Sequence, residues 1–351
     1  EELGRELGER HGDHYLNADR DAAIAQLGEE GLNRMLQQIR LDLEAIGVEF
    51  DVWFREKDLY EDGRYADSIS FLRGKGLTKV EDGAEWFTSS ELGDEKDNVI
   101  VRSTGVPTYF ASDIAYHRDK FGRRGFDRVI DIWGADHQGH VPRMKAVMRA
   151  LDLDPERLTI LIAQLVTLKS GGDIVRASKR TGQIVTLSDL VSEVGADACR
   201  YFFLARAAES QMEFDLELAK QQSSDNPVYY VQYAHARIAG ILRQASERGI
   251  AWDDGDPSLL THEAELALVR KMLQLPELID AIAITLAPHS LPHYAVDLAT
   301  AFHWFYDHCR VLSPNATEAA LMRARLNLVE AAKIALARTL NLMGMSTPDS
   351  M

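Results

Sequence analysis

The most constraining feature of this 351-residue sequence is a strand–helix–strand pattern between residues 129 and 168. Residues 129–133 and 158–168 are short apolar runs of strand character, and residues 141–151 between them have the periodicity of a helix. Gly134 ends the first run. A helix that joins two buried strands is typical of a parallel sheet, so the pattern predicts an α/β fold. Ligands of such sheets bind beyond the carboxyl ends of the strands.

A cationic loop, GGDIVRASKRTG, follows the second strand at residues 171–182. Arg176, Lys179 and Arg180 place three cations within five residues, and Ser178 adds a hydroxyl group. A loop with glycine at both ends can close over a substrate, and its cations can stabilise negative charge that develops on phosphate. The loop is not a P-loop, because the sequence contains no GxxxxGK[ST] string. Taken alone, it could equally be a solvated hairpin.

The segment RASKR at residues 176–180 resembles the KMSKS loop of class I aminoacyl-tRNA synthetases. Arginine replaces the first lysine and alanine replaces the methionine, whereas the serine and the second lysine are present. Residues 185–238, from VTLSDLV to AHARI, are similar to arginyl-tRNA synthetases. The same resemblance covers TYFASDIAYHRDKF and VIDIWGADHQGHVPRMKAVM upstream, and it extends to the last residue.

The resemblance implies an α/β plus all-α fold class with two domains. Residues 1–222 would form a partial class I nucleotide-binding (Rossmann-like) core that contains a small β insertion and the KMSKS-like loop. Residues 223–351 would form a helical-bundle anticodon-binding domain of the DALR type. The implied activity is arginine–tRNA ligation through an arginyl-adenylate, in which Arg176, Ser178, Lys179 and Arg180 act on the phosphates of ATP.

The family's arginine-binding positions correspond to Tyr109, Asp113 and His137. Tyr109 and Asp113 are four residues apart, so they share one face of a helix. A guanidinium group requires a carboxylate that accepts two parallel hydrogen bonds, which fits Asp113. In the absence of the resemblance, Asp113 would be interpreted as a charge that complements the positive end of its helix.

The segment Gly134-Ala135-Asp136-His137 occupies the place where class I synthetases contact the nucleotide. We therefore expect Gly134 and Asp136 to contact ATP, although Asp136 could instead cap a turn at the end of the strand. Residues 137–140 spell HQGH, the form of the HIGH signature, but HIGH belongs to an earlier strand–helix unit. We expect HIGH and the N-terminal tRNA-binding domain to lie outside these 351 residues, which begin at Glu1. The chain alone is then expected to be inactive.

The chain is predicted to be wholly helical after Asn226-Pro227, with helices joined by loops that contain Pro276, Pro288 and Pro314. Aromatic and cationic side chains interleave on the first of these helices and suit unstacked anticodon bases, although some belong to the core. The candidates for tRNA contact are Tyr229, Tyr230, Tyr233, His235 and Arg237. Asp197-Ala198-Cys199-Arg200 resembles the DALR signature, where we expect Asp197 to cap a helix and Arg200 to pair.

Other elements follow from local pattern. Residues 21–46 predict a helix capped by Asp19 or Asp21, and residues 48–54 alternate as a strand does. Glu81-Asp82-Gly83 marks a hairpin turn. Residues 98–103 predict a third strand and residues 108–121 a helix.

Composition excludes several classes of protein. The net charge is −16, divided as −12 up to Gln222 and −4 beyond it, so any RNA contact is a local patch that depends on salt. The absence of a long apolar run argues against a membrane protein. Cys199 and Cys309 fit reduced thiols of a cytoplasmic protein and form no metal site.

Mg²⁺ is expected to accompany ATP as substrate, with no tightly bound cofactor. The expected partners are tRNA(Arg), L-arginine and ATP, and the expected state is monomeric. Two alternatives stay open at this point: another class I synthetase such as the cysteinyl enzyme, and a tRNA-binding module without catalytic activity.

Overall fold

The computed structural model describes residues 2–174 and 185–351. The chain divides into two compact units, each of which is described separately. The α/β unit comprises Phe50–Thr167 and Ala208–Glu213. The helical unit comprises Glu1–Glu49, Leu168–Ala207 and Phe214–Met351. The domain boundary expected after residue 222 stays a prediction.

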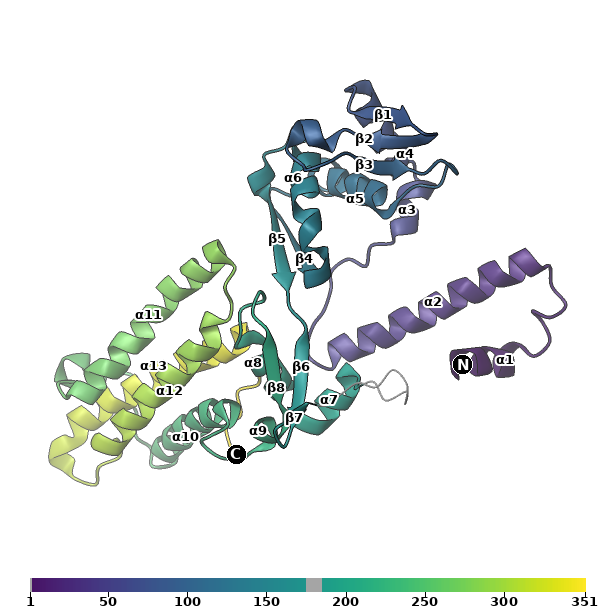
Figure 1. Cartoon of the computed structure of the whole chain (residues 1–351). Helices are drawn as coiled ribbons and strands as arrows, with labels where there is room; N and C mark the ends of the chain where they lie inside the picture. The colour runs from purple at the N-terminus through teal and green to yellow at the C-terminus, as the bar shows by residue number, and fades with distance from the viewer. Residues whose placement is uncertain (1, 175–184) are drawn as a thin grey trace. The chain divides into compact units, whose positions relative to one another are not determined.

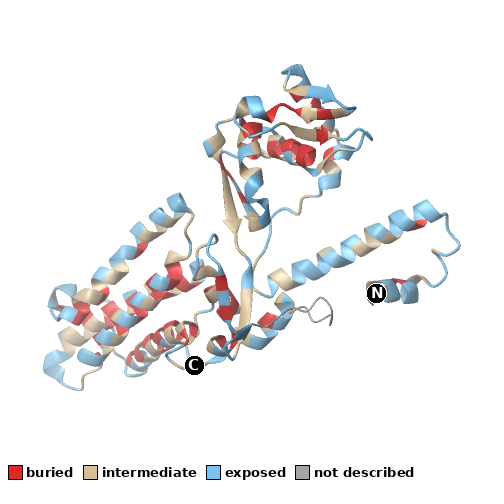
Figure 2. Cartoon of the chain, viewed as in Figure 1, coloured by how far each residue is buried: buried red, intermediate tan, exposed pale blue. Residues whose placement is uncertain are grey.

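The α/β unit has two small sheets with helices packed around one core (Figures 1 and 2). Its larger side chains without solvent exposure include Phe87, Ile100, Ile114, Met144 and Leu158. Its elements are α3 (Glu56–Glu61), α4 (Arg64–Gly74), β1 (Thr78–Glu81), β2 (Ala84–Phe87), β3 (Asn98–Val101), α5 (Tyr109–Arg118), β4 (Val129–Gly134), α6 (Val141–Ala150) and β5 (Leu158–Ala163).

The predicted parallel sheet is confirmed. Strand β4 pairs with β5 in parallel, from Val129 opposite Leu158 to Gly134 opposite Ala163, and α6 forms the crossover. The predicted insertion is the antiparallel sheet β1-β2-β3. Asp82 and Gly83 both have positive φ, as a two-residue hairpin turn requires.

The helical unit is built mainly from long helices, and α12 packs against α10, α11 and α13. The buried side chains of this unit include Leu298, Phe302 and Phe305. Its elements are α1 (Glu2–His11), α2 (Arg20–Glu44), α7 (Leu187–Val194), α8 (Ala196–Leu204), α9 (Leu216–Lys220), α10 (Pro227–Glu247), α11 (Glu263–Thr285), α12 (Ser290–His308) and α13 (Ala319–Leu342). Strands β7 (Asp173–Ile174), β6 (Val166–Ser170) and β8 (Met212–Asp215) form a further sheet in that order.

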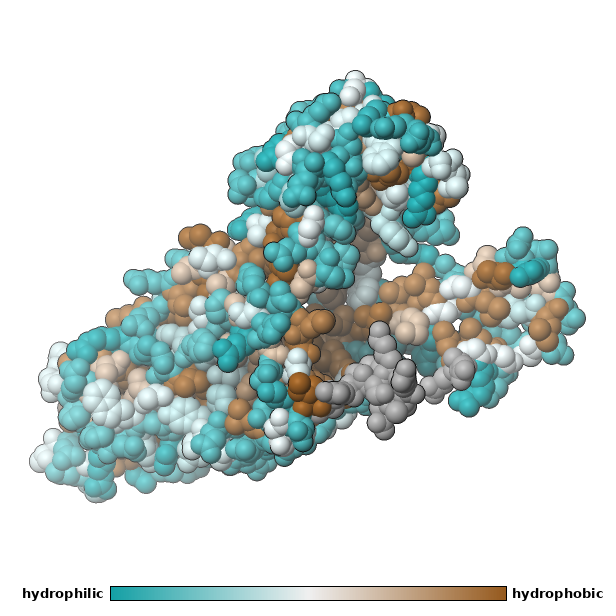
Figure 3. Space-filling model, viewed as in Figure 1, coloured by the Kyte–Doolittle hydropathy of each residue, from teal (hydrophilic) through white to brown (hydrophobic). Residues whose placement is uncertain are grey.

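Helix α2 matches its prediction in extent, and Asp19 caps it by accepting hydrogen bonds from the backbone of Asp21 and Ala22. Its apolar side chains are mostly exposed, as Figure 3 shows along this helix. Among the described residues of α2, only Ala23 is buried.

Three local predictions are wrong. Residues 48–54 form no strand, because alternating apolar side chains are insufficient without a partner strand to satisfy the backbone. The run 158–168 is interrupted after β5, where the Gln164 amide donates to the Ala208 carbonyl, 2.9 Å away. Pro276 lies inside α11 instead of in a loop. Proline in a helix removes one hydrogen bond, which the packing of α11 against α12 offsets.

The DALR-like segment ties the C-terminal residues to the rest of the helical unit. Asp197 does not cap α8, since Gly195 holds that position; its carboxylate instead accepts hydrogen bonds from Gln232 and Ser346. The Arg200 guanidinium donates to the carbonyls of Ile46 and Met343. The expected roles of Asp197 as cap and Arg200 as ion-pair partner are therefore corrected, although both residues do hold structure together.

No helix within residues 2–174 and 185–351 is both long enough and apolar enough to cross a membrane.

Candidate functional site

Helix α5 presents one side to the core and the other to a cavity of about 270 Å³. Ala111, Ile114 and Ala115 are buried in the core, whereas Tyr109 and Asp113 reach solvent at the cavity. The prediction that these two residues share a helical face is therefore confirmed. The cavity is lined by Phe54, Glu56, Leu59, Tyr109, Ser112, Asp113 and Tyr116.

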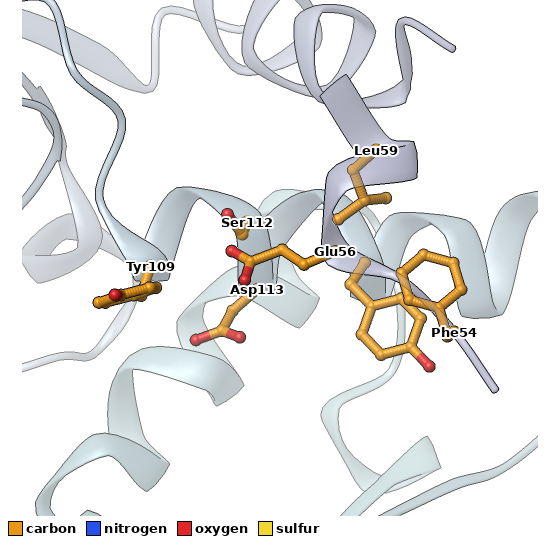
Figure 4. A pocket seen from close by; sticks show the side chains of 7 residues that line it. Phe54, Glu56, Leu59, Tyr109, Ser112 and Asp113 are labelled. Carbon is orange, nitrogen blue, oxygen red and sulfur yellow. The ribbon is translucent and has the colours of Figure 1, made fainter. Parts of the chain in front are cut away.

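Two carboxylates face this cavity. Glu56 at the start of α3 reaches toward Asp113, as Figure 4 shows. Burial by the surrounding protein raises the pKa of Asp113. His117 and Arg143 oppose this shift, and the negative charge of Glu56 adds to it. Phe54 and Tyr116 form an aromatic wall, with their rings stacked at 4.1 Å between centroids. Acidic groups beside aromatic faces suit a delocalised cation.

A second cavity, of about 180 Å³, is also lined by Asp113. His137 lines it with His140, Arg143 and Trp133. Burial lowers the pKa values of His140 and Arg143, and the Arg143 charge lowers that of His140 further. The Arg143 guanidinium also lies 5.0 Å from the centre of the Phe110 ring. Asp113 thus lines both cavities.

Gly134 and Asp136 lie at the carboxyl end of β4 and at the start of the 3₁₀ turn Ala135–His140. A Cβ atom on Gly134 would approach the Asp136 carboxylate to 2.7 Å, so glycine makes room for that side chain. Asp136 is exposed, and its Oδ2 lies 3.5 Å from His137 Nε2. Both residues are therefore accessible to a ligand at the edge of the sheet where α/β proteins bind nucleotides.

The four residues expected in the cationic loop, Arg176, Ser178, Lys179 and Arg180, lie outside the described residues. The chain is described again just before α7, which Thr186 caps. Thr186 and Asp189 exchange hydrogen bonds between side chain and backbone in a capping box.

The predicted tRNA-contacting residues lie on α10 of the helical unit. The rings of Tyr229 and Tyr233 stack, with centroids 6.0 Å apart, and Tyr233 also stacks on His303 of α12. The Arg237 guanidinium lies 5.5 Å from the centre of the Tyr233 ring and 4.2 Å from that of Tyr306. The hydroxyl groups of Tyr230 and Thr300 are 3.2 Å apart. We call this aromatic and cationic surface, formed by residues 229, 230, 233, 237, 303 and 306, the α10–α12 cluster.

His235 departs from this pattern. Its side chain is only 2% exposed, and Nδ1 lies 2.9 Å from the Pro348 carbonyl oxygen. This position leaves no surface for a direct contact with RNA, so the prediction for His235 is corrected. The side chain instead holds the C-terminal residues against α10.

No group of three or more metal-ligating side chains occurs in the part of the chain that the structure describes.

Comparison with known proteins identifies the family. A model described as the catalytic domain of class I tRNA synthetases (R) matches residues 17–220, and a DALR anticodon binding domain matches residues 231–351. The chain belongs to the arginyl-tRNA synthetase family. It is 57% identical over 350 residues to the arginine–tRNA ligase of Dehalococcoides mccartyi and 48% identical to that of Carboxydothermus hydrogenoformans. It spans 62% and 63% of the lengths of these relatives.

Solved structures agree with this family assignment. A putative arginyl-tRNA synthetase from Campylobacter jejuni superimposes with a TM-score of 0.88 at 32% identity, covering all of this chain and 75% of that one. Arginyl-tRNA synthetase from Thermus thermophilus has the same fold, with a TM-score of 0.78 at 21% identity, and 68% of that chain is covered. The predicted fold class is confirmed. The comparisons give no support to a cysteinyl enzyme or to a non-catalytic module.

Within this family member, sequence reasoning missed several residues around the cavities and the cluster. Tyr116 lies three residues after Asp113 on the same helix, so helical spacing alone could have found it. Glu56 and Phe54 come from a distant segment and have no local signal. His303 and Tyr306 are one turn apart on α12. They lie among the buried apolar residues of this helix, so the sequence pattern there indicates a core helix and gives no separate signal for them.

Proposed function

We propose that this chain supplies part of the catalytic site and the anticodon-binding domain of an arginine–tRNA ligase. In the proposed reaction, the arginine carboxylate attacks the α-phosphate of ATP, giving arginyl-adenylate and pyrophosphate. The arginyl group then passes to the terminal adenosine of tRNA(Arg). Mg²⁺ enters with ATP as part of the substrate. Monomeric state and cytoplasmic location are proposed from the sequence.

The observation that carries this proposal is the acidic cavity on α5. The substrate's guanidinium group is planar and permanently charged, so its removal from water demands a carboxylate with matching geometry. Asp113 is positioned for this role, with Tyr109 at the same cavity and Glu56 opposite. His137 lines the adjoining cavity, and we assign it to the arginine substrate as well.

The nucleotide would bind beside these residues. We assign Gly134 and Asp136 to ATP because a strand that ends in glycine lets a ligand approach the backbone, and an exposed carboxylate can accept hydrogen bonds from ribose hydroxyls. Lys179, with Arg176, Ser178 and Arg180, would stabilise the pentavalent phosphate and the departing pyrophosphate.

The α10–α12 cluster is our candidate for contact with the anticodon loop. Bases of single-stranded RNA stack on aromatic rings and on guanidinium planes, and the cluster offers both. Tyr233 is its most open aromatic residue, with 37% of its surface exposed.

The second carboxylate provides a direct test of the arginine assignment. Glu56→Gln, made in a full-length synthetase that carries this chain, should raise the KM for arginine severalfold. The effect should be smaller than that of removing Asp113, because Asp113, whose pKa is raised by burial, is assigned as the direct partner of the guanidinium group, whereas water screens the charge of the exposed Glu56. The measurement is steady-state aminoacylation at varied arginine concentration.

Glu61→Gln is the matched control for Glu56→Gln. Glu61 ends the same short helix and pairs with Lys57 at 2.9 Å, but it does not line the cavity. Equal KM values for the two variants would argue against guanidinium binding in this cavity.

The RNA assignment predicts that Tyr233→Ala weakens tRNA(Arg) binding by about 1–3 kcal/mol, or roughly five- to 150-fold, because one stacking surface is lost. Filter binding or fluorescence anisotropy at several salt concentrations would measure it. Affinity should fall as salt rises, since phosphate contacts release counterions.

Trp304→Ala is the control for Tyr233→Ala. Trp304 is exposed to a similar degree on α12 but contacts His308 edge to face, outside the cluster. A loss as large with Trp304→Ala, or binding that is insensitive to salt, would count against the α10–α12 cluster as the contact surface.

A further inference from the structure

Behind the arginine cavity lies a buried polar network that the proposed reaction does not use. It is centred on Asp131 of β4, whose side chain is 9% exposed. One carboxylate oxygen lies 2.7 Å from His117 Nε2, and the other accepts a hydrogen bond from Lys120 Nζ at 2.8 Å. Burial alone would raise the pKa of Asp131, but the hydrogen bond and charge of His117, together with Lys120, lower it to about 2.

The first arm of the network leads to Asp113. His117 is 3% exposed, and its Nδ1 lies 2.7 Å from the backbone carbonyl oxygen of Asp113. A carbonyl and an ionised carboxylate only accept hydrogen bonds, so each ring nitrogen of His117 faces an acceptor. The His117 ring thereby connects β4 to the turn of α5 that carries the guanidinium-binding carboxylate.

The second arm leads to the aromatic wall. Lys120 Nζ lies 4.3 Å from the centre of the Tyr116 ring, in cation–π geometry. Tyr116 in turn stacks on Phe54, and both rings line the cavity. The same carboxylate therefore contacts one group that holds the Asp113 backbone and a second group that holds the Tyr116 ring.

We propose that Asp131, acting through His117 and Lys120, is a positioning residue that sets the geometry of the arginine cavity. None of the three side chains lines either cavity, so they do not touch the substrate. They hold Asp113 and Tyr116 in place before arginine arrives, which lowers the ordering cost of binding. This inference rests on the proposed binding of arginine by Asp113.

The test uses a full-length synthetase that carries this chain. Asp131→Asn leaves Lys120 and the His117 ring facing a neutral amide, and it should raise the KM for arginine at least tenfold while the KM for ATP stays within twofold. His117→Gln retains a donor toward Asp131 but loses the donor toward the Asp113 carbonyl. Lys120→Met removes the cation over the Tyr116 ring together with its ion pair to Asp131. Each should raise the KM for arginine, by a smaller factor than Asp131→Asn. If Asp131→Asn does not fold, the KM values for arginine of His117→Gln and Lys120→Met test the proposal.

Non-additivity distinguishes a network from three separate contacts. The double variant His117→Gln/Asp131→Asn should have the same KM for arginine as Asp131→Asn alone. The reason is that Asp131→Asn already removes the contact through which His117 acts. Glu85→Gln is the control for general destabilisation: Glu85 is buried in the same unit and pairs with Arg73 at 2.6 Å, outside both cavities. It should lower the melting temperature without changing the KM for arginine.

Two results would overturn the inference: folded variants whose KM for arginine stays within twofold of the parent, or an equal rise in the Glu85→Gln control. Failure of the proposed function has a different signature. In that case Asp113→Asn would also leave the arginine dependence unchanged, whereas failure of the positioning role alone would leave the effect of Asp113→Asn intact.

Discussion

Asp113→Asn in a full-length synthetase should lower kcat/KM for arginine by roughly 150- to 5,000-fold, which corresponds to a loss of about 3–5 kcal/mol. The substitution preserves size but removes the charge, and it turns one acceptor into a donor that faces the donors of the guanidinium group. The substrate's cation would then be held in the cavity without a full counter-charge. Aminoacylation at varied arginine concentration measures the effect, and tRNA binding should be unchanged.

Asp113→Glu refines this test. It retains the charge but displaces it by one methylene group, so activity should be impaired less than in Asp113→Asn. If kcat/KM of Asp113→Asn were within a fewfold of the parent value, Asp113 would be interpreted as a charge that complements the positive end of its helix and not as the guanidinium partner. Asp136 would then be the next candidate for the guanidinium partner.

Lys179→Ala should lower the rate of arginine activation by about 2.7–4 kcal/mol, roughly 100- to 1,000-fold, with little change in arginine affinity. The reason is that this lysine is assigned to charge that develops only as pyrophosphate departs. Single-turnover formation of arginyl-adenylate in a full-length synthetase separates the rate from the affinity.

Lys169→Ala, ten residues upstream of Lys179, controls for the loss of a cation near the loop. It should leave the activation rate within a few-fold of the parent. If Lys179→Ala weakened ground-state binding instead and left the rate unchanged, the assignment of this loop to the transition state would be wrong.

Local periodicity predicted those elements whose structure is determined by residues close together in the sequence. The β4–α6–β5 crossover followed from two apolar runs around a helical pattern, and the face shared by Tyr109 and Asp113 followed from their spacing. Glu56 could not be found in this way, because it meets Asp113 only through the packing of α3 on α5.

Two other errors have distinct physical causes. Residues 48–54 have the alternation of a strand, but pairing depends on a partner that the pattern does not contain. His235 was grouped with its aromatic neighbours, although Val231 and Ile238 on the same helical face are buried. Attention to the helical period would have separated it from Tyr229, Tyr233 and Arg237, which are four residues apart on another face.

The tie between the C-terminal residues and the DALR-like segment bears on how the protein is made. Ser346 bonds to Asp197 across 149 residues of sequence, and Pro348 meets His235 across 113. A Cβ atom on Gly344 would collide with the Arg200 guanidinium, so this residue must be glycine for the tie to close. During translation, α8 and α10 therefore emerge from the ribosome long before the segment that secures them. Until residues 343–348 have been synthesised, the nascent helical unit lacks the contacts that these residues make with α8 and α10. We expect chaperones to bind the unit most readily at this stage.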